Sequence, residues 1–174
     1  MNPRQRRLFA DLHHMQELAA RDDRVSFQAD GDPPEAYNVL LNRVGLARQA
    51  SGELTLRHVH RFVVYLHLDY PRRPPQISWL TPIFHPNILS PDRNGGVCIG
   101  MWSASESLSD LVMRVATMVE YGSFNADDAL DLEAAAWVRS NRVKPGAPLE
   151  SLARRSTMSV DDDEIVVLAR QRSA

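Results

Sequence analysis

The spacing of apolar residues divides this chain into a helix, a run of strands, a long loop and further helices. In the first segment Asn2 is a good N-cap and Pro3 suits the first helical position, and apolar residues then recur every three or four positions to about Ala19. From Arg24 the period changes to two, which is typical of a strand, until the turn-forming residues 30–34. An N-terminal helix followed by a first strand is therefore predicted.

Three more extended stretches follow, at residues 37–48, 57–70 and 76–81. The middle stretch alternates apolar and polar side chains, which predicts a strand with one buried face. Because the connections between the four strands are short, we expect an antiparallel meander, since parallel pairing needs longer crossovers. His58 and His60, which fall on one face of a strand, are expected at the surface.

Regular periodicity is lost from Thr81 to roughly Glu106. A loop of such length inside a compact domain is either functional or disordered. This loop is rich in Ile, Leu, Val, Met and Trp, and that content is too apolar for a solvated linker. We therefore expect it to pack against the sheet and to carry Cys98 with it.

Two helices are predicted after the loop. Ser107 is the expected N-cap of the first, with Asp110 three residues later in the manner of a capping box, and Gly122 is its expected end. A shorter helix is predicted over residues 130–138, after a polar connection.

Composition limits the size and the partners of the protein. With 174 residues, 44% of them hydrophobic, the chain can bury one core. The composition changes after residue 142, so we predict a domain of residues 1–142 and a C-terminal appendage, 143–174, of unspecified order. A net charge of -2 argues against a nucleic-acid-binding surface spread over the whole domain. Neither a signal-peptide pattern nor a long apolar run is visible, so a soluble cytoplasmic protein without a membrane partner is expected.

Cys98 is the single cysteine of the chain. It cannot form an internal disulfide, and one cysteine does not supply a structural zinc site, so it is either a small core residue or a reagent. A thiol suits acyl transfer because it is both a nucleophile and a good leaving group. An ordinary cysteine has a pKa of about 8.5, so a small thiolate fraction is present at neutral pH; that suffices for exchange with an activated acyl donor and is meagre for attack on an amide. The chemistry favours carrying an acyl group over hydrolysing a peptide, and no cofactor or metal is predicted.

The order of these elements and motifs resembles the ubiquitin-conjugating enzymes over about residues 3–141. In chain order the motifs are Tyr70-Pro71 with Pro74-Pro75, His85-Pro86-Asn87, Cys98, Trp102-Ser103 and Asn125-Ala126-Asp127-Asp128. The resemblance implies an α+β fold with an N-terminal helix, a four-stranded antiparallel meander, a long active-site loop and C-terminal helices, and it makes residues 1–142 the catalytic domain. It also implies an acyltransferase in which Cys98 receives a ubiquitin-like protein from an activating enzyme, as a thioester, and passes it to an acceptor amine.

The resemblance assigns roles to a predicted catalytic set of four residues. Cys98 would carry the acyl group, and Asn87 resembles the family's asparagine that holds the active-site loop and stabilises the oxyanion. His85 would be structural, bonding within its own loop. Asp128 resembles the acid that orients or deprotonates the incoming amine, and an ordinary helix N-cap is the alternative, compatible reading of this residue.

The resemblance also implies partner surfaces. Arg4, Arg6 and Arg7 on the first helix would meet the activating enzyme, unless they are simply a solvated face, and Phe84 would belong to a ligase-facing end. The expected partners are a ubiquitin-like protein, an activating enzyme, and a ligase or a direct acceptor protein. Of the 20 basic residues only Lys144 is lysine. The simplest explanation of this bias is codon usage in a GC-rich genome, and the alternative is that a protein handling amine-reactive acyl groups gains by lacking amines of its own. With the divergence from the family pattern, the bias is also what we expect of a bacterial conjugation system, such as those of antiphage defence, so a bacterial origin is predicted.

Two departures from the family pattern lie near the thiol. Cys98 follows Asn87 by eleven residues, longer than the usual interval, so residues 88–97 must fold back to bring the two together. Ala126 and Ala129 replace the prolines that flank the family's paired acids. The alternative functions are a non-catalytic variant of the same fold that binds a ubiquitin-like protein, and a papain-like peptidase, for which the local sequence cues are lacking.

Overall fold

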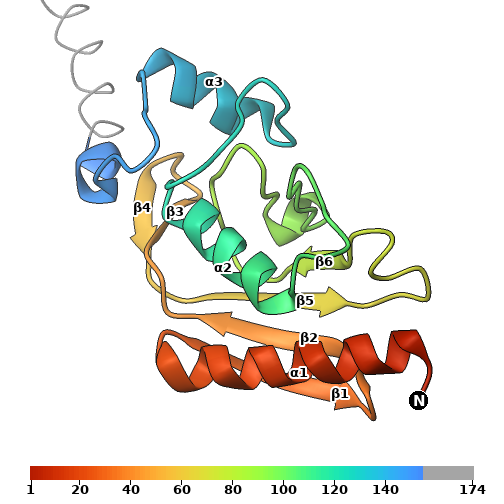
Figure 1. The fold of residues 1–174 in the computed structure, drawn as a ribbon. Coiled ribbons are helices and arrows are strands. Elements are labelled where there is room, and N and C mark those ends of the chain that lie inside the picture. Colours follow the sequence, from red (N-terminus) through yellow and green to blue (C-terminus); the bar gives the residue numbers. More distant parts are fainter. Residues whose placement is uncertain (155–174) are drawn as a thin grey trace, which may run out of the picture.

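The computed structural model describes residues 1–154, in which two helices pack against one face of a four-stranded antiparallel sheet (Figure 1). The elements are α1 (Pro3–Arg21), β1 (Val25–Gly31), β2 (Pro34–Leu41), β3 (Gly45–Arg48), β4 (Leu54–Arg57), β5 (His60–Tyr65), β6 (Gln76–Trp79), the short 3-10 helix η1 (Pro91–Arg93), α2 (Leu108–Val119) and α3 (Leu132–Ser140). The strand order is β1-β2-β5-β6, with every neighbouring pair antiparallel. The predicted α+β fold and its meander are confirmed.

The first two helices begin where their capping residues predict. The side chain of Asn2 accepts the amide hydrogen of Gln5, whose own side chain accepts from the Asn2 amide, so both orphan donors are satisfied. Ser107 caps α2 in the same position. The predicted end of α2 is displaced: the helix stops at Val119, and Tyr121 rather than Gly122 takes the left-handed conformation, with φ of 57°.

The stretch 37–48, predicted as one strand, is divided into β2 and β3. Between them Arg43 is buried, and its guanidinium binds Asp22 at 2.5 Å and Glu120 at 3.4 Å. The chain leaves the four-stranded sheet at this point, and β3 then pairs with β4 as a separate hairpin. The apolar pattern of residues 37–48 did not show this break. The partners of Arg43 at the break, Asp22 and Glu120, lie far away in the sequence.

His60 is fully buried, so its predicted place at the surface is wrong. It opens β5 on the same side of the strand as Phe62 and Val64, which face the core, and strand alternation therefore turns it inward too. Its ring lies against Trp79, and one ring nitrogen is 3.1 Å from the carbonyl oxygen of Arg57. Burial lowers the pKa of His60 to about 4.

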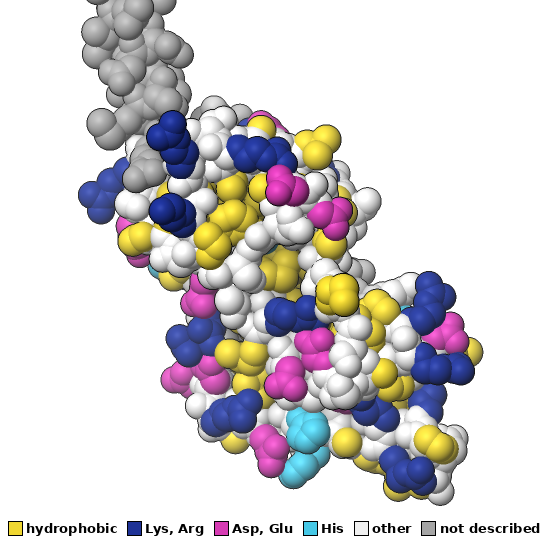
Figure 2. Space-filling view, turned by 45° about the horizontal axis from the view of Figure 1, so that its top comes forward, with side chains coloured by type: hydrophobic (Ala, Val, Ile, Leu, Met, Phe, Trp, Pro, Cys, Tyr) yellow, Lys and Arg dark blue, Asp and Glu magenta, His cyan; other side chains and the backbone are white. Residues whose placement is uncertain are grey.

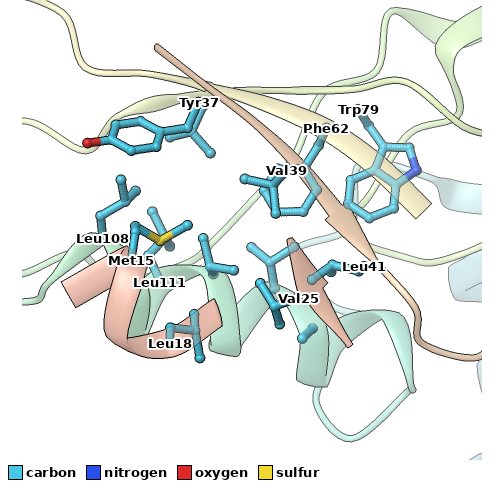
Figure 3. Close-up of a cluster of buried hydrophobic side chains, with 14 of the residues drawn as sticks. Met15, Leu18, Val25, Tyr37, Val39, Leu41, Phe62, Trp79, Leu108 and Leu111 are labelled. Atoms are coloured by element: carbon cyan, nitrogen blue, oxygen red, sulfur yellow. The ribbon is translucent and has the colours of Figure 1, made fainter. Parts of the chain in front are cut away.

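The main core fills the space between α1, α2 and the inner face of the sheet (Figure 3). Met15 and Leu18 from α1 and Leu111 from α2 face Val39 and Phe62 from the sheet, and all five side chains are buried. Each large apolar side chain buried in this way stabilises the fold by about 1.5–3 kcal/mol. The long loop that follows β6 is thus built on a firmly packed sheet.

A second core cluster joins the β3–β4 hairpin, α3 and the chain beyond it. Its buried members are Leu46, Leu54, Phe84, Tyr121, Ala134, Val138, Val143, Leu149 and Leu152. The predicted division of the chain at residue 142 falls inside this cluster, while residues 155–174 of the predicted appendage lie outside the described residues. In residues 1–154 no helix is long and apolar enough to cross a membrane.

Candidate active site

Residues 88–97 fold back on themselves as a compact insert. Ile88 and Val97 form an antiparallel bridge, and the amide of Leu89 donates to the carbonyl oxygen of Gly96 at 2.8 Å. The amide of Cys98 then donates to the carbonyl oxygen of its predicted neighbour in the site, Asn87, at 2.9 Å. The long interval between Asn87 and Cys98 is therefore absorbed by a closed loop, which brings the two residues side by side.

The insert is attached to the edge of the sheet through Gly95. The amide of Trp79, in β6, donates to the carbonyl oxygen of Gly95 at 2.8 Å, and Ser78 bridges Gly96. Gly95 has φ of 65°, and a Cβ atom at this position would lie 2.4 Å from the carbonyl oxygen of Trp79. Only glycine fits such a close approach in this conformation, so Gly95 fixes the insert, and with it Cys98, against β6.

The side chain of Asn87 holds the segment 125–128 against the loop that carries Cys98. Its amide nitrogen donates to the carbonyl oxygens of Asn125 at 2.9 Å and Asp128 at 3.0 Å, and its side-chain oxygen accepts from the Asn125 amide at 2.7 Å. The side chain is almost fully buried. Both amide hydrogens are thus engaged with backbone carbonyls, and the geometry is that of a clamp between two loops.

His85 lies in the interior next to Asn87 and binds the backbone of that residue. The ring is fully buried, its Nδ1 accepts the backbone amide hydrogen of Asn87 at 3.0 Å, and Tyr121 packs edge-on against it. Burial lowers the pKa of His85 to about 3, so the ring is neutral near pH 7. A neutral, buried ring that accepts a hydrogen bond from its own loop shapes that loop and does not face the solvent.

Cys98 is partly exposed at the wall of a pocket of about 170 Å³. The pocket is lined by Asn87, Cys98, Ile99, Gly100, Arg114, Met118, Ser123, Phe124, Asn125 and Asp128. Three of the four predicted catalytic residues therefore meet at one pocket, and the fourth, His85, lies buried behind Asn87.

Asp128 lines this pocket from an exposed turn. Hydrogen bonds fix both the amide and the carbonyl group of its backbone. The amide donates to the Asn125 side chain at 3.2 Å, and the carbonyl oxygen accepts from the Asn87 side chain. The alternative reading of Asp128 as a helix N-cap is wrong, since α3 begins at Leu132 and Asp131 caps it. The Asp128 carboxylate is left to face the solvent beside the pocket of the thiol.

Sequence reasoning missed Arg114, which lines the same pocket from α2. Its guanidinium donates to the carbonyl oxygens of Ile99 and Met101, both at 2.8 Å, and binds the carboxylate of Glu106 at 2.9 Å. The available signal was the position itself, since Arg114 interrupts an otherwise apolar stretch of the helix. Ser123 and Phe124 were also missed, and nothing in their local pattern distinguishes them.

The predicted partner residues differ in how they are placed. Arg6 is exposed, whereas Arg4 binds Glu35 at 2.5 Å and the carbonyl oxygen of Leu66 at 2.9 Å. Arg7 is also held within the fold. It binds Asp11 at 2.8 Å, the Tyr70 hydroxyl at 2.7 Å, and the carbonyl oxygens of Ala104 and Glu106. Of the three arginines, Arg6 is the one left most available to a partner.

Phe84 is 3% exposed, which contradicts its predicted place on a partner-facing surface. Its ring packs edge-on against Trp137, and the guanidinium of Arg48 covers it at 4.4 Å from the ring centre. The α3 side of the second core cluster buries the ring, and this contact between distant segments was not visible in the sequence. Figure 2 shows basic, acidic and hydrophobic side chains interspersed over one face of the molecule, without a broad area of one charge.

A family model described as ubiquitin-conjugating enzyme matches residues 49–147. The chain belongs to the ubiquitin-conjugating enzyme family. The matched region contains the insert, Cys98, both helices that follow it and the whole pocket, while α1 and the first three strands lie before it. Membership of the ubiquitin-conjugating enzyme family supports a general role in the conjugation of ubiquitin-like proteins. It also implies a ubiquitin-like protein and an activating enzyme as partners.

Proposed function

We propose that this ubiquitin-conjugating enzyme carries a ubiquitin-like protein as a thioester on Cys98, received from an activating enzyme, and transfers it to an acceptor amine. The observation that carries the proposal is the pocket in which a partly exposed thiol meets Asn87 and the exposed Asp128. A purely structural cysteine is expected in the core, whereas Cys98 is partly exposed and lines the same pocket as the exposed Asp128. The family membership supplies the class of acyl group.

In the loading step, the Cys98 thiolate attacks the carbonyl carbon of the ubiquitin-like protein's C-terminal thioester on the activating enzyme. A new carbon–sulfur bond forms, the older one breaks, and the activating enzyme's thiolate leaves, so no oxidant or reductant is needed. In the discharge step, an amine attacks the same carbonyl carbon, loses one proton and expels the Cys98 thiolate. Each half of the reaction is an acyl exchange.

Within this proposal Asn87 positions the segment 125–128 beside the thiol through its three hydrogen bonds. This segment carries the Asp128 carboxylate, which would accept a hydrogen bond or the proton from the attacking amine. The predicted oxyanion role of Asn87 would require one amide hydrogen to leave a backbone carbonyl oxygen, and it stays a prediction. His85 keeps the loop in shape from its buried position.

The proposal is tested by loading the purified protein with ATP and a pair of ubiquitin-like protein and activating enzyme, taken first from genes next to its own. Non-reducing electrophoresis should show an adduct that dithiothreitol removes. Cys98→Ala should show none. Persistence of the adduct on Cys98→Ala would reject the thioester. Binding of the ubiquitin-like protein without any adduct would instead favour the non-catalytic binding module.

The acid is tested in the discharge step alone. Asp128→Asn should load normally and then transfer to free lysine at least tenfold more slowly than the wild type, because the neutral amide takes up no proton. Asp127→Asn, one residue earlier and also exposed, is the matched control and should discharge at the wild-type rate. Equal rates for the two variants would remove Asp128 from the proposal.

We also propose, from the predicted resemblance, that the conjugation system is bacterial and serves antiphage defence. The support is compositional, namely the single lysine among the basic residues. Deletion of the gene from its host followed by phage plating tests the biological role. Unchanged plaque counts across a broad phage panel would overturn it.

A further inference from the structure

Arg114 reaches from α2 to the stretch of chain that directly follows Cys98. Its Nη1 donates to the carbonyl oxygens of Ile99 and Met101, both at 2.8 Å. Its Nη2 binds the carboxylate of Glu106 at 2.9 Å. One side chain therefore holds three points of the loop that carries the thiol.

The stretch between Cys98 and Trp102 is tied at its two ends. The Cys98 amide donates to the carbonyl oxygen of Asn87 at 2.9 Å, and the Trp102 indole donates to the carbonyl oxygen of Pro71 at 2.8 Å. Between these ties lies Gly100, with φ of 69° and open space around it. The Met101 side chain is 91% exposed, so apolar packing of that residue adds nothing to the order of the stretch. Ile99 packs partly against the main core, and the two bonds from Arg114 hold the backbone on either side of Gly100.

Glu106, which binds the Arg114 guanidinium, is itself connected to α1. Glu106, the carboxylate partner of Arg114, donates its amide to the carbonyl oxygen of Ser103 at 3.0 Å, and its own carbonyl oxygen accepts from Arg7. Arg7 is fixed in turn by Asp11, whose carboxylate also accepts the amide of Leu108 at the start of α2. The guanidinium of Arg114 is thus oriented by a carboxylate that the fold holds in place.

We propose that Arg114 is a positioning residue for acyl transfer: by binding the Ile99 and Met101 carbonyl oxygens it sets the direction of the Cys98 thiol within the pocket. This inference rests on the proposed function of Cys98. A purely structural arginine would affect stability alone. A positioning arginine changes how fast the loaded and unloaded thiol reacts without changing how tightly the partners bind.

The experiment compares Arg114→Ala with Arg114→Lys and with Arg61→Ala, a control arginine exposed on the outer side of β5. Hydrogen exchange is measured on peptides that cover residues 98–106, and the rate of Cys98 alkylation by iodoacetamide is measured on the same proteins. Loading from a fixed amount of the activating enzyme is then followed over a range of concentrations of the conjugating enzyme. The curve separates the maximal loading rate from the concentration of conjugating enzyme that gives half of it.

For Arg114→Ala we expect at least tenfold faster exchange in residues 98–106, at least threefold faster alkylation, and a maximal loading rate lowered at least tenfold with an unchanged half-saturation concentration. Arg114→Lys, which keeps a positive charge and N–H donors at this position, should recover at least a third of the loading rate. Arg61→Ala should match the wild type throughout. Glu106→Gln keeps Arg114 but removes its carboxylate partner, and it serves as the test if Arg114→Ala does not fold. Its exchange, alkylation and loading rates should lie between those of the wild type and Arg114→Ala.

Three results would overturn the inference: unchanged exchange and alkylation in Arg114→Ala, faster exchange with an unchanged maximal loading rate, or no recovery by lysine. If the wild type itself forms no adduct, the proposed function fails. Exchange and alkylation would still show whether Arg114 orders the loop around Cys98, because neither measurement needs a partner protein.

Discussion

Replacement of Asn87 by alanine removes a clamp that joins two loops of the site. The side chain makes three hydrogen bonds to backbone groups of Asn125 and Asp128, at 2.7–3.0 Å, and it is 3% exposed. Alanine leaves those backbone groups without their side-chain partner and creates space at the centre of the contact. The loss should appear first as a loss of stability.

The expected size follows from the number of bonds. A hydrogen bond within a protein contributes a net 0.5–1.5 kcal/mol, roughly, and a buried group left unpaired costs more than the mean bond is worth. Three bonds at about 1 kcal/mol each give a loss of about 3 kcal/mol in the free energy of unfolding. For a domain of this size that corresponds to a fall in Tm of about 6–12 °C. Asn87→Asp should cost at least as much, because the new oxygen would face two carbonyl oxygens.

Urea unfolding followed by circular dichroism measures the free energy directly. Asn38→Ala, an asparagine exposed on the outer side of β2, is the matched control and should change it by less than about 0.5 kcal/mol. If Asn87→Ala were as stable as Asn38→Ala while still failing to discharge, the clamp would be irrelevant to folding. The side chain would then act in the chemical step, as the family resemblance predicts.

Two further predictions concern the support of the site. Gly95→Ala should destabilise the protein by at least about 2 kcal/mol and slow loading, because its Cβ would clash with the carbonyl oxygen of Trp79; thermal melts and loading rates check this, and a neutral substitution would contradict the close approach. Lowering the pH from 7.5 to 5 should reduce the free energy of unfolding by about 2 kcal/mol for each of His60 and His85. Burial lowers the pKa values of His60 and His85 to about 4 and about 3, so on acidification the two residues take up protons first in the unfolded chain. The stability that is present above pH 6.5 is therefore lost as the pH falls from 6.5 towards these lower pKa values. Urea titrations at both pH values measure this loss, and His60→Gln should halve it; equal stability at the two pH values would contradict the burial of the two rings.

Much of the fold could be predicted because local rules govern it. Asn2 and Ser107 cap their helices through contacts three residues away, and strand alternation sets the buried face of β5. The same alternation turns His60 inward, although it was predicted at the surface. The β3–β4 hairpin escaped prediction because Arg43 binds residues distant in the sequence.

The site shows the same limit. The motifs predicted that Asn87, Cys98 and Asp128 belong together, and the pocket brings them together. Phe84 was misplaced because its cover comes from α3, and Arg114 was missed because its partners are backbone carbonyl groups, which no side-chain motif records.

The linkage on Cys98 can be measured directly by intact-protein mass spectrometry of the loaded enzyme. The adduct should have the summed mass of the two proteins less one water, and dithiothreitol should remove it. Cys98→Ser should give an ester adduct of nearly the same mass that survives dithiothreitol and is cleaved by hydroxide, and Cys98→Ala should give none. A wild-type adduct that resists dithiothreitol, or any adduct on Cys98→Ala, would contradict a thioester on this residue.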